Sequence, residues 1–311
     1  MSVSPSVRTT RTHRILHLSD PHLTGRGFDE DGVDAAAALD RILIDARFVA
    51  GLDLVVVSGD IADDGSAEGC AEVRRRVGAF AAERGIPHFY STGNHDTRAG
   101  FAAALGSGHL GPDGTDIGRL FDLTREPVTP AAGEPGPAGE RAAVTEVSGL
   151  RVITLDSLVP GSVQGEISAA QLTWLGSVLA EEAPAGTVVV LHHPPIVLES
   201  PPTRSVVLRN PDDLGRVLAG TDVRAVLCGH LHLQLSGSLY GVPVWVTPGI
   251  VTRVDATAPP HQVRAVKGAG ASVVDLGGPF SPMVHTLQAR DPQAGAEVYV
   301  VDAWSGAEVA G

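Results

Sequence analysis

Residues of the types that bind metal ions follow several short apolar runs in this 311-residue chain. The motifs are Asp20-Pro21-His22, Gly59-Asp60, Gly93-Asn94-His95-Asp96, His192-His193-Pro194-Pro195 and Gly229-His230-Leu231-His232. Together they offer carboxylate, amide and imidazole groups. This mixture of oxygen and nitrogen ligands suits Mn, Fe or Zn better than Mg or Ca. The chemistry that it predicts is metal-assisted hydrolysis.

Each motif alone also has an ordinary structural explanation. Asp20 and His22 fit a turn, and Asn94 after Gly93 fits a residue in a left-handed turn conformation. The pair His230 and His232 is the strongest single indication, because residues two apart on an extended backbone face the same side. The occurrence of all the motifs in one chain, each after an apolar strand, favours metal binding over the structural explanation.

Compact apolar runs, several of them rich in valine and isoleucine, predict the buried strands that position these motifs. They are Arg14–Leu18, Leu54–Ser58, Arg151–Asp156, Thr187–Leu191 and Arg224–Cys228. Amphipathic segments between them predict helices at Asp34–Val49, Ser66–Arg84, Ser168–Glu182 and Pro211–Ala219. Beyond residue 230 the chain reads as strands without helices, at Leu235–Tyr240, Val244–Thr247, Ala271–Leu276, Met283–Gln288 and Glu297–Val301. We therefore expect an α/β sandwich with mixed sheets that is antiparallel towards its C-terminal end.

Two of the predicted helices carry clear end signals. Ser168 and Gln171 form a capping box. Asn210 precedes Pro211, which is an N-cap residue followed by proline at the first helical position, and Gly220 follows the last apolar residues. Both helices are expected to cover a sheet.

The chain is predicted to form a flexible tail over residues 1–13 and one domain over residues 14–311. The Gly- and Pro-rich segment 105–141 is expected to be a flexible loop insertion, and Val251–Ala269 a second mobile loop. Antiparallel strands are expected over about residues 271–301 at the C-terminal end.

Composition narrows the classes of function. The net charge is −13, from 23 basic and 36 acidic residues, which argues against binding to nucleic-acid polymers. The two cysteines, Cys70 and Cys228, make no disulfide framework, so a reducing compartment fits. The first residues lack the apolar run of a signal peptide, and no apolar stretch approaches the roughly 18 residues of a membrane span. We expect a cytoplasmic protein.

The carboxyl ends of strands in an open α/β sheet line the ligand crevice, so the motif residues should gather at one edge. The set contains two carboxylates, one amide and four imidazoles, and this number suits two ions. A shared carboxylate can bridge two cations about 3.5–4 Å apart. The candidate ligands are Asp20, His22, Asp60, Asn94, His192, His230 and His232.

The order of these motifs resembles the signature of the calcineurin-like metallophosphoesterases. Other segments resemble the bacterial class III cyclic-nucleotide phosphodiesterases within that superfamily. They are Leu155-Asp156-Ser157, Gly165-Glu166-Ile167, Gln171-Leu172-Thr173-Trp174-Leu175 and Leu214-Gly215-Arg216-Val217-Leu218. The resemblance spans residues 14–290 and departs at segment 105–141 and in both tails. These departures bear on substrate preference and leave the predicted metal site unaffected.

The resemblance implies a fold and a set of residue roles. The fold would be a sandwich of two mixed sheets flanked by helices, in the order α/β/β/α. One ion would be held by Asp20, His22, Asp60 and His232, and the other by Asp60, Asn94, His192 and His230. Asp60 would bridge the ions, and His95 would act as general acid. His193 and Asp96 would support the ligands from outside the first coordination layer.

The activity implied by the resemblance is hydrolysis of 3′,5′-cyclic nucleotides such as cyclic AMP. A hydroxide that bridges two ions (Fe or Mn, with Zn as the alternative) would attack in line and produce a nucleoside 5′-monophosphate. The partner would be a small phosphodiester, and the family also suggests a homodimer. Two alternatives stay open. One is another phosphodiesterase or phosphomonoesterase, such as a glycerophosphodiesterase, and the other is a non-catalytic binding scaffold on the same fold.

Overall fold

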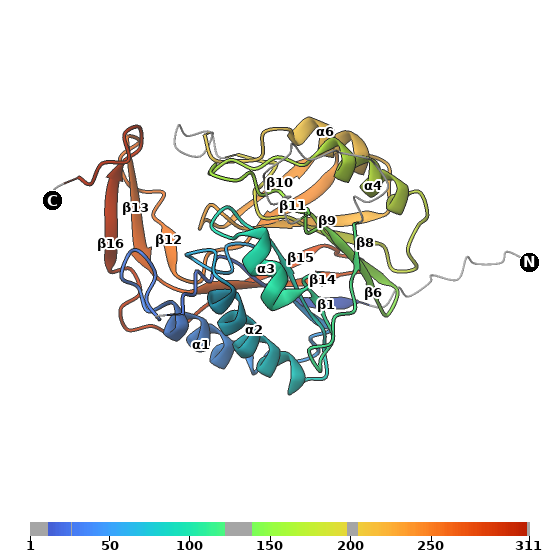
Figure 1. Ribbon diagram of the computed structural model, residues 1–311, viewed down its shortest axis with the longest axis horizontal. Coiled ribbons are helices and arrows are strands. Elements are labelled where there is room, and N and C mark those ends of the chain that lie inside the picture. Colours follow the sequence, from blue (N-terminus) through green and yellow to red (C-terminus); the bar gives the residue numbers. More distant parts are fainter. Residues whose placement is uncertain (1–11, 26, 122–138, 198–204, 310–311) are drawn as a thin grey trace, which may run out of the picture.

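The computed structural model describes residues 12–25, 27–121, 139–197 and 205–309. Two β-sheets lie face to face with helices on their outer sides, and a smaller third sheet stands at one end (Figure 1). This arrangement confirms the predicted α/β sandwich of two mixed sheets flanked by helices. The third sheet is an addition that the sequence patterns did not predict.

The first sheet has six strands in the order β15-β14-β1-β2-β3-β4. The strands β1, β2 and β3 are parallel, whereas β14 runs antiparallel to β1. Among the described residues, the helices α1 and α2 pack on the outer face of this sheet. The elements are β1 (His13–Leu18), α1 (Ala35–Ala46), β2 (Leu54–Ser58), α2 (Ala67–Ala82), β3 (His88–Ser91), α3 (Arg98–Leu105), β4 (His109–Leu110), β14 (Gly270–Leu276) and β15 (Met283–Gln288).

The second sheet has seven strands in the order β10-β11-β9-β8-β7-β6-β5. Its central strands β7, β8 and β9 are parallel, and α4 and α6 pack on its outer face. The elements are β5 (Arg119–Leu120), β6 (Ala143–Val147), β7 (Leu150–Thr154), α4 (Ala169–Leu179), β8 (Thr187–Val190), α6 (Pro211–Leu218), β9 (Val223–Cys228), β10 (Leu235–Leu239) and β11 (Val242–Val246).

The third sheet consists of β12 (Thr252–Val254), β13 (Gln262–Lys267) and β16 (Glu297–Asp302), all antiparallel. The prediction of a mobile loop over Val251–Ala269 was therefore wrong. In that segment β12 pairs with β13, and β13 is held in turn by pairing with the distant strand β16. Local sequence does not reveal a pairing of that kind, because its hydrogen bonds come from a distant strand.

Apolar residues fill the space between the two large sheets and the space under the helices. Ile15, Val56 and Phe89 of the first sheet meet Val152 and Val190 of the second in one buried cluster. Separate clusters join α1 and α2 to the first sheet, and α4 and α6 to the second. The near-continuous apolar strands predicted from the sequence are thus buried on both faces.

The predicted helix ends are only partly confirmed. Ser168 Oγ accepts a hydrogen bond from the backbone N–H of Gln171, as a cap should. The side chain of Gln171 instead binds the backbone of Asp156, so the second half of the capping box does not form. Asn210 precedes α6 as predicted, but its amide pairs with the backbone of Ile167 and makes no cap.

The segment predicted as a loop insertion, residues 105–141, contains the two-residue strands β4 and β5, and residues 122–138 lie outside the described residues. None of the helices in the described part of the chain combines the length and the hydropathy that a bilayer span requires.

His109 links the two large sheets. It lies on β4 of the first sheet, and its Nδ1 and Nε2 lie 2.7 Å from Thr145 Oγ1 and 2.9 Å from Thr154 Oγ1 of the second. The side chain is fully buried. Burial lowers the pKa of His109 from an ordinary value of 6.5 to about 3. The imidazole is therefore a neutral polar bridge within the sandwich.

This bridge should make folding sensitive to acid. Below pH 6.5 the unfolded chain binds a proton that folded His109 does not, so stability falls as the pH decreases from 6.5 towards 3. We expect His109→Gln to reduce the slope of unfolding free energy against pH by about 1.4 kcal/mol per pH unit between about pH 6 and pH 4. Urea unfolding at several pH values measures that slope. The exposed residue His285 provides the control His285→Gln, and equal slopes in wild type and His109→Gln would contradict the prediction.

Candidate metal centre

The predicted ligands lie in the loops that follow β1, β2, β3, β8 and β9. Because neighbouring strands are parallel in each group, these loops leave the two sheets at the same edge. Backbone hydrogen bonds join the loops directly: His22 N–H donates to the Asp60 carbonyl at 3.0 Å, and Gly229 N–H to the His192 carbonyl at 3.1 Å. All seven predicted ligand residues are brought together.

Five of these seven residues have backbone conformations that are uncommon for residues with side chains. Their φ angles are positive, between 45° and 71°, and the residues are Asp20, His22, Asp60, His230 and His232. Such conformations cost roughly 1–3 kcal/mol each and persist only where the surrounding structure enforces them. Their concentration here marks a functional site, since an ordinary turn would place glycine or asparagine at such positions.

The motif glycines allow the loops to approach closely. A Cβ atom at Gly229 would collide with Ser19 Oγ, and a Cβ at Gly93 would collide with the carboxylate and backbone of Asp60. Gly59 faces the ring of His192 in the same way. These glycines are therefore steric requirements of the cluster.

One group of ligand atoms surrounds Asp20 and His22. Asp20 Oδ1 lies 3.4 Å from His232 Nε2, and His22 Nε2 lies 3.5 Å from Asp60 Oδ2. Ligand atoms of Asp20, His22 and His232 all lie within 4.8 Å of one another. This spacing allows them to share one ion.

A second group surrounds His192 Nε2. That atom lies 3.1 Å from Asp60 Oδ2, 3.2 Å from Asn94 Oδ1 and 3.2 Å from His230 Nδ1. Asp60 Oδ2 thus faces a histidine of each group, His22 on one side and His192 on the other. The carboxylate of Asp60 lies between the two groups.

The buried carboxylates in this cluster are stabilised by positive charge nearby. Asp20 and Asp60 are 0% and 2% exposed. Burial alone would raise their pKa values, but His232 next to Asp20 and His192 next to Asp60 hold the pKa of each carboxyl below its ordinary value. Burial opposes charge on the histidines too, yet the carboxylates outweigh it and raise the pKa of His22 and His192 to about 9. Protons on these histidines offset the buried carboxylate charge, and bound cations could do the same.

The residues present fit metal ions. Among the described residues, His22 Nε2 is buried without a hydrogen-bond partner and faces the carboxylate of Asp60. A buried polar atom of this kind needs a partner, and a metal ion would supply one. Two carboxylates, an amide oxygen and four imidazoles form a donor set typical of Mn, Fe or Zn.

Three ligands are oriented through their other ring nitrogen. His192 Nδ1 donates to the Ser58 carbonyl at 2.7 Å, His22 Nδ1 lies 2.8 Å from Asp63 Oδ1, and His232 Nδ1 lies 2.7 Å from Thr252 Oγ1. Such contacts set the tautomer and the ring direction of metal-binding histidines. The sequence analysis missed Thr252, because it lies in the segment expected to be a mobile loop.

His95, the predicted general acid, lies beside the cluster. Its ring contacts that of His22 edge-on, with centroids 4.6 Å apart, and its side chain is 28% exposed. Nδ1 donates to the Asp63 carbonyl at 3.1 Å, which leaves Nε2 available to a substrate. The Asp63 carbonyl and carboxylate therefore orient both His95 and His22.

The two supporting residues have distinct contacts. The Asp96 carboxylate accepts backbone N–H groups of Ile61, Ala62 and Gly93, so it ties the Asp60 loop to the Asn94 loop. His193 is buried, and its Nδ1 lies 2.7 Å from Ser157 Oγ. Both side chains brace the loops, and neither orients His95.

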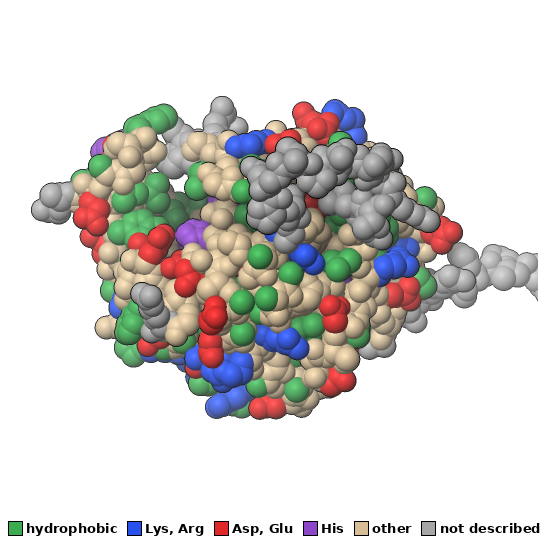
Figure 2. All heavy atoms as spheres, in the orientation of Figure 1, with side chains coloured by type: hydrophobic (Ala, Val, Ile, Leu, Met, Phe, Trp, Pro, Cys, Tyr) green, Lys and Arg blue, Asp and Glu red, His purple; other side chains and the backbone are tan. Residues whose placement is uncertain are grey.

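The surface near this cluster is hollowed and acidic. Figure 2 shows a hollow with a histidine side chain at its edge, hydrophobic side chains gathered on one side and acidic side chains below. The N–H of Glu30 donates to Asp63 Oδ2 at 2.8 Å, which anchors the segment Asp29-Glu30-Asp31 beside the ligands. Burial, followed by the charges of Asp31 and Asp63, raises the pKa of Asp29 to about 6.

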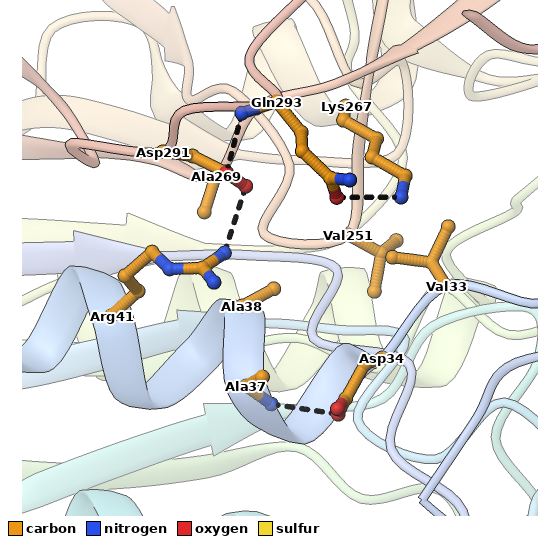
Figure 3. A pocket seen from close by; sticks show the side chains of 11 residues that line it. Val33, Asp34, Ala37, Ala38, Arg41, Val251, Lys267, Ala269, Asp291 and Gln293 are labelled. Atoms are coloured by element: carbon orange, nitrogen blue, oxygen red, sulfur yellow. Dashed lines mark hydrogen bonds and ion pairs between the residues drawn. The ribbon is translucent and has the colours of Figure 1, made fainter. Parts of the chain in front are cut away.

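A separate cavity of about 210 Å³ lies between α1 and the segments around Lys267 and Asp291 (Figure 3). Its charged groups already have partners. Arg41 Nη1 binds Asp291 Oδ2 at 2.8 Å, and Lys267 Nζ binds Gln293 Oε1 at 3.0 Å. None of the predicted ligands lines it, so the candidate centre is the cluster at the sheet edge.

Comparison with known proteins agrees with this geometry. Residues 13–234 match the family described as calcineurin-like phosphoesterase. A probable cyclic nucleotide phosphodiesterase of Rhodococcus erythropolis is 39% identical over 250 residues, covering 79% of this chain and 73% of the relative. A cAMP/cGMP dual specificity phosphodiesterase of Mycobacterium tuberculosis is 37% identical over 267 residues, covering 84% and 75%.

Among solved structures, GAP50, the anchor in the inner membrane complex of Plasmodium, superimposes with a TM-score of 0.52. The alignment covers 96% of this chain and 87% of that one at 12% sequence identity. At this identity the likeness concerns the fold alone.

Thr252 offers a test of ligand orientation. We expect Thr252→Val to weaken metal binding by roughly 10- to 100-fold, because His232 loses the partner that fixes its ring. Metal affinity is measured by competition with a chromogenic chelator. Thr257→Val is the matched control, since Thr257 is exposed and binds Asp255. Unchanged affinity in a folded Thr252→Val protein would refute the role.

Proposed function

The chain belongs to the calcineurin-like phosphoesterase family, and from this membership we propose that it is a two-metal phosphodiesterase acting on 3′,5′-cyclic nucleotides. Membership makes the protein a hydrolase of phosphoric esters. The number of ions, the role of each residue and the preference for a cyclic nucleotide are our proposals.

The position of Asp60 carries the proposal for two ions. One carboxylate oxygen of Asp60 faces both His22 and His192, so a single residue can serve both ligand groups. The backbone N–H of His95 donates to the other oxygen at 2.9 Å, which fixes the carboxylate plane. We assign one ion to Asp20, His22, Asp60 and His232 and the other to Asp60, Asn94, His192 and His230.

Two bound ions, with Fe or Mn as our choice, would neutralise the phosphate charge and supply an acidified water as the nucleophile. The protein's own residues complete the reaction. The buried carboxylates and imidazoles hold the ions in a fixed place, and the loops that carry them are clamped to one another by backbone hydrogen bonds. The scissile phosphate is thereby positioned at the edge of both sheets.

His95 is proposed to protonate the leaving oxygen. In a 3′,5′-cyclic nucleotide that oxygen becomes an alkoxide, which is a poor leaving group, and a positioned acid contributes roughly 10²- to 10⁴-fold. The hydrogen bond from Nδ1 to the Asp63 carbonyl directs Nε2 to the substrate side. The partial exposure of His95 gives Nε2 access to substrate.

Charge near the site supports a diester over a monoester. The segment Asp29-Glu30-Asp31 lies beside Asp63 and the ligands. A phosphodiester carries one negative charge, whereas a phosphomonoester carries close to two at pH 7. The negative charge of this acidic segment therefore repels a monoester more strongly than a diester.

The relatives support the cyclic nucleotide as substrate. Two proteins with 39% and 37% identity are named as cyclic nucleotide phosphodiesterases, and each match covers more than three quarters of this chain. No second function has a comparable observation in its favour.

The proposal is tested by Mn²⁺-supplemented hydrolysis of 3′,5′-cyclic AMP beside 2′,3′-cyclic AMP, glycerophosphodiesters, bis(p-nitrophenyl) phosphate and p-nitrophenyl phosphate. We expect cyclic AMP to be turned over at least as well as the other substrates, and p-nitrophenyl phosphate to be the poorest. Asn94→Ala serves as the blank, because it removes an oxygen 3.2 Å from His192 Nε2. Metal analysis should find less bound metal in this variant.

The alternatives give different results. Activity on glycerol or aryl diesters but not on cyclic AMP would support a phosphodiesterase and contradict the cyclic nucleotide as its substrate. A protein that binds no metal and hydrolyses nothing would indicate a binding scaffold.

His95→Ala separates acid catalysis from metal binding. We expect bound metal to stay at the wild-type level and cyclic AMP turnover to fall by roughly 10²- to 10⁴-fold. Bis(p-nitrophenyl) phosphate should be affected much less, because p-nitrophenolate leaves without a proton. Metal analysis and steady-state rates on both substrates measure this, with His261→Ala, an exposed histidine, as control. Equal losses on both substrates would remove the acid role.

A further inference from the structure

The third sheet is attached directly to the metal centre. Its first strand begins at Thr252, whose hydroxyl binds His232, and Val254 N–H donates to the His232 carbonyl at 3.0 Å. The sheet therefore starts at a ligand residue and extends away from it. In Figure 1, β12 lies nearest the body of the molecule and β16 furthest from it.

The pairing register shows which side chains share a face of this sheet. Val254 pairs with Ala265, Ala265 with Tyr299, and Val263 with Val301. Directly paired residues, and residues two apart on a strand, point to the same side. One face is therefore largely apolar, with Thr252 and Lys267 at one end of it, and Val254, Val263, Tyr299 and Val301 on it are only partly buried.

The opposite face is different in character. Arg264 lies there and forms ion pairs with Asp255 and Glu297. The paired charges need no further partner. The apolar face, which remains partly open, is the one with surface to offer a ligand.

The largely apolar face is turned towards the metal centre, because Thr252 lies on the same side of β12 as Val254 and its hydroxyl lies 2.7 Å from His232 Nδ1. Burial, followed by the charges of Asp31, Glu30 and Asp29, raises the pKa of Tyr299 to about 12. Asp31 in turn interacts electrostatically with His22 and His232. The acidic segment is tied to the ligands through Asp63, whose carboxylate accepts a hydrogen bond from the N–H of Glu30 and lies 2.8 Å from His22 Nδ1. Within the described residues, the Tyr299 hydroxyl makes no hydrogen bond.

We propose that this apolar face, with Tyr299 at its centre, is the surface on which the base of the nucleotide rests while its phosphate lies at the metal centre. The inference rests on the proposed function and names the residues that recognise the organic part of the substrate. A purine offers a planar, largely apolar face, which suits an aromatic ring flanked by valines. Stacking tolerates different bases, so adenine and guanine should both be accepted.

Figure 2 agrees with this arrangement, since hydrophobic side chains gather beside the hollow that has a histidine at its edge. The acidic segment fits as well. Its carboxylates border the place where the uncharged base and ribose would lie, so they repel ligands that carry further phosphates there.

The test compares Tyr299→Ala and Tyr299→Phe with Val300→Ala, a neighbour on the same strand whose side chain points to the other face. Two substrates are used: 3′,5′-cyclic AMP, and methyl riboside 3′,5′-cyclic phosphate, which keeps the cyclic diester and lacks the base. For Tyr299→Ala we expect kcat/KM on cyclic AMP to fall by roughly 5- to 100-fold, mostly through KM. The base-free substrate should change little, and Tyr299→Phe and Val300→Ala should stay near wild type.

Four results would overturn the inference. Equal losses on both substrates would indicate damage to the metal centre, and no loss on cyclic AMP would show that the base rests elsewhere. If sedimentation shows that Tyr299→Ala breaks up an oligomer while the ratio of the two rates stays constant, the face joins copies of the chain. A wild-type enzyme that hydrolyses other diesters and leaves cyclic AMP untouched would instead remove the proposed substrate, and the base surface with it.

Discussion

The burial of two carboxylates at one edge of the sandwich is the constraint on which the rest of this structure depends. Asp20 and Asp60 are almost inaccessible to water, and an uncompensated buried charge is very costly. The surrounding histidines meet part of that demand by holding protons, as the raised pKa values of His22 and His192 indicate. The proposed metal ions would meet it more fully, because they bring more positive charge than the protons do.

The same constraint explains the backbone around the site. Bringing ligands from five loops into one small volume requires close approach, which the motif glycines allow, and left-handed conformations at five ligand residues. These conformations are unfavourable, and the packed sandwich behind them supplies the stability that maintains them. The buried cluster between the sheets and the His109 bridge keep the two halves in a fixed relation. Without that relation, Asp60 from one sheet and His192 from the other would not meet.

In the proposed function, recognition of phosphate and recognition of the rest of the substrate belong to different parts of the chain. The ligands come from loops between the two large sheets, whereas the third sheet is built from the last 60 residues. A metal centre interacts with the charge and geometry of the phosphate group and discriminates little among the alcohols esterified to it. We assign discrimination among organic groups to the acidic segment Asp29-Glu30-Asp31 and to the largely apolar face around Tyr299.

The sequence by itself determined the ligand types, their order and the class of fold. Apolar strands followed by Asp, Asn and His residues leave few arrangements open, because parallel strands deliver their carboxyl ends to a common edge. Contacts between segments far apart in the chain were decided only by the tertiary structure. Examples are the pairing of β13 with β16, the hydrogen bond between Thr252 and His232, and the hydrogen bonds of the Gln171 side chain to the backbone of Asp156 in place of a helix cap. Local patterns report the preferences of a few consecutive residues, whereas these contacts depend on which distant backbone groups come within hydrogen-bonding distance once the two sheets have packed.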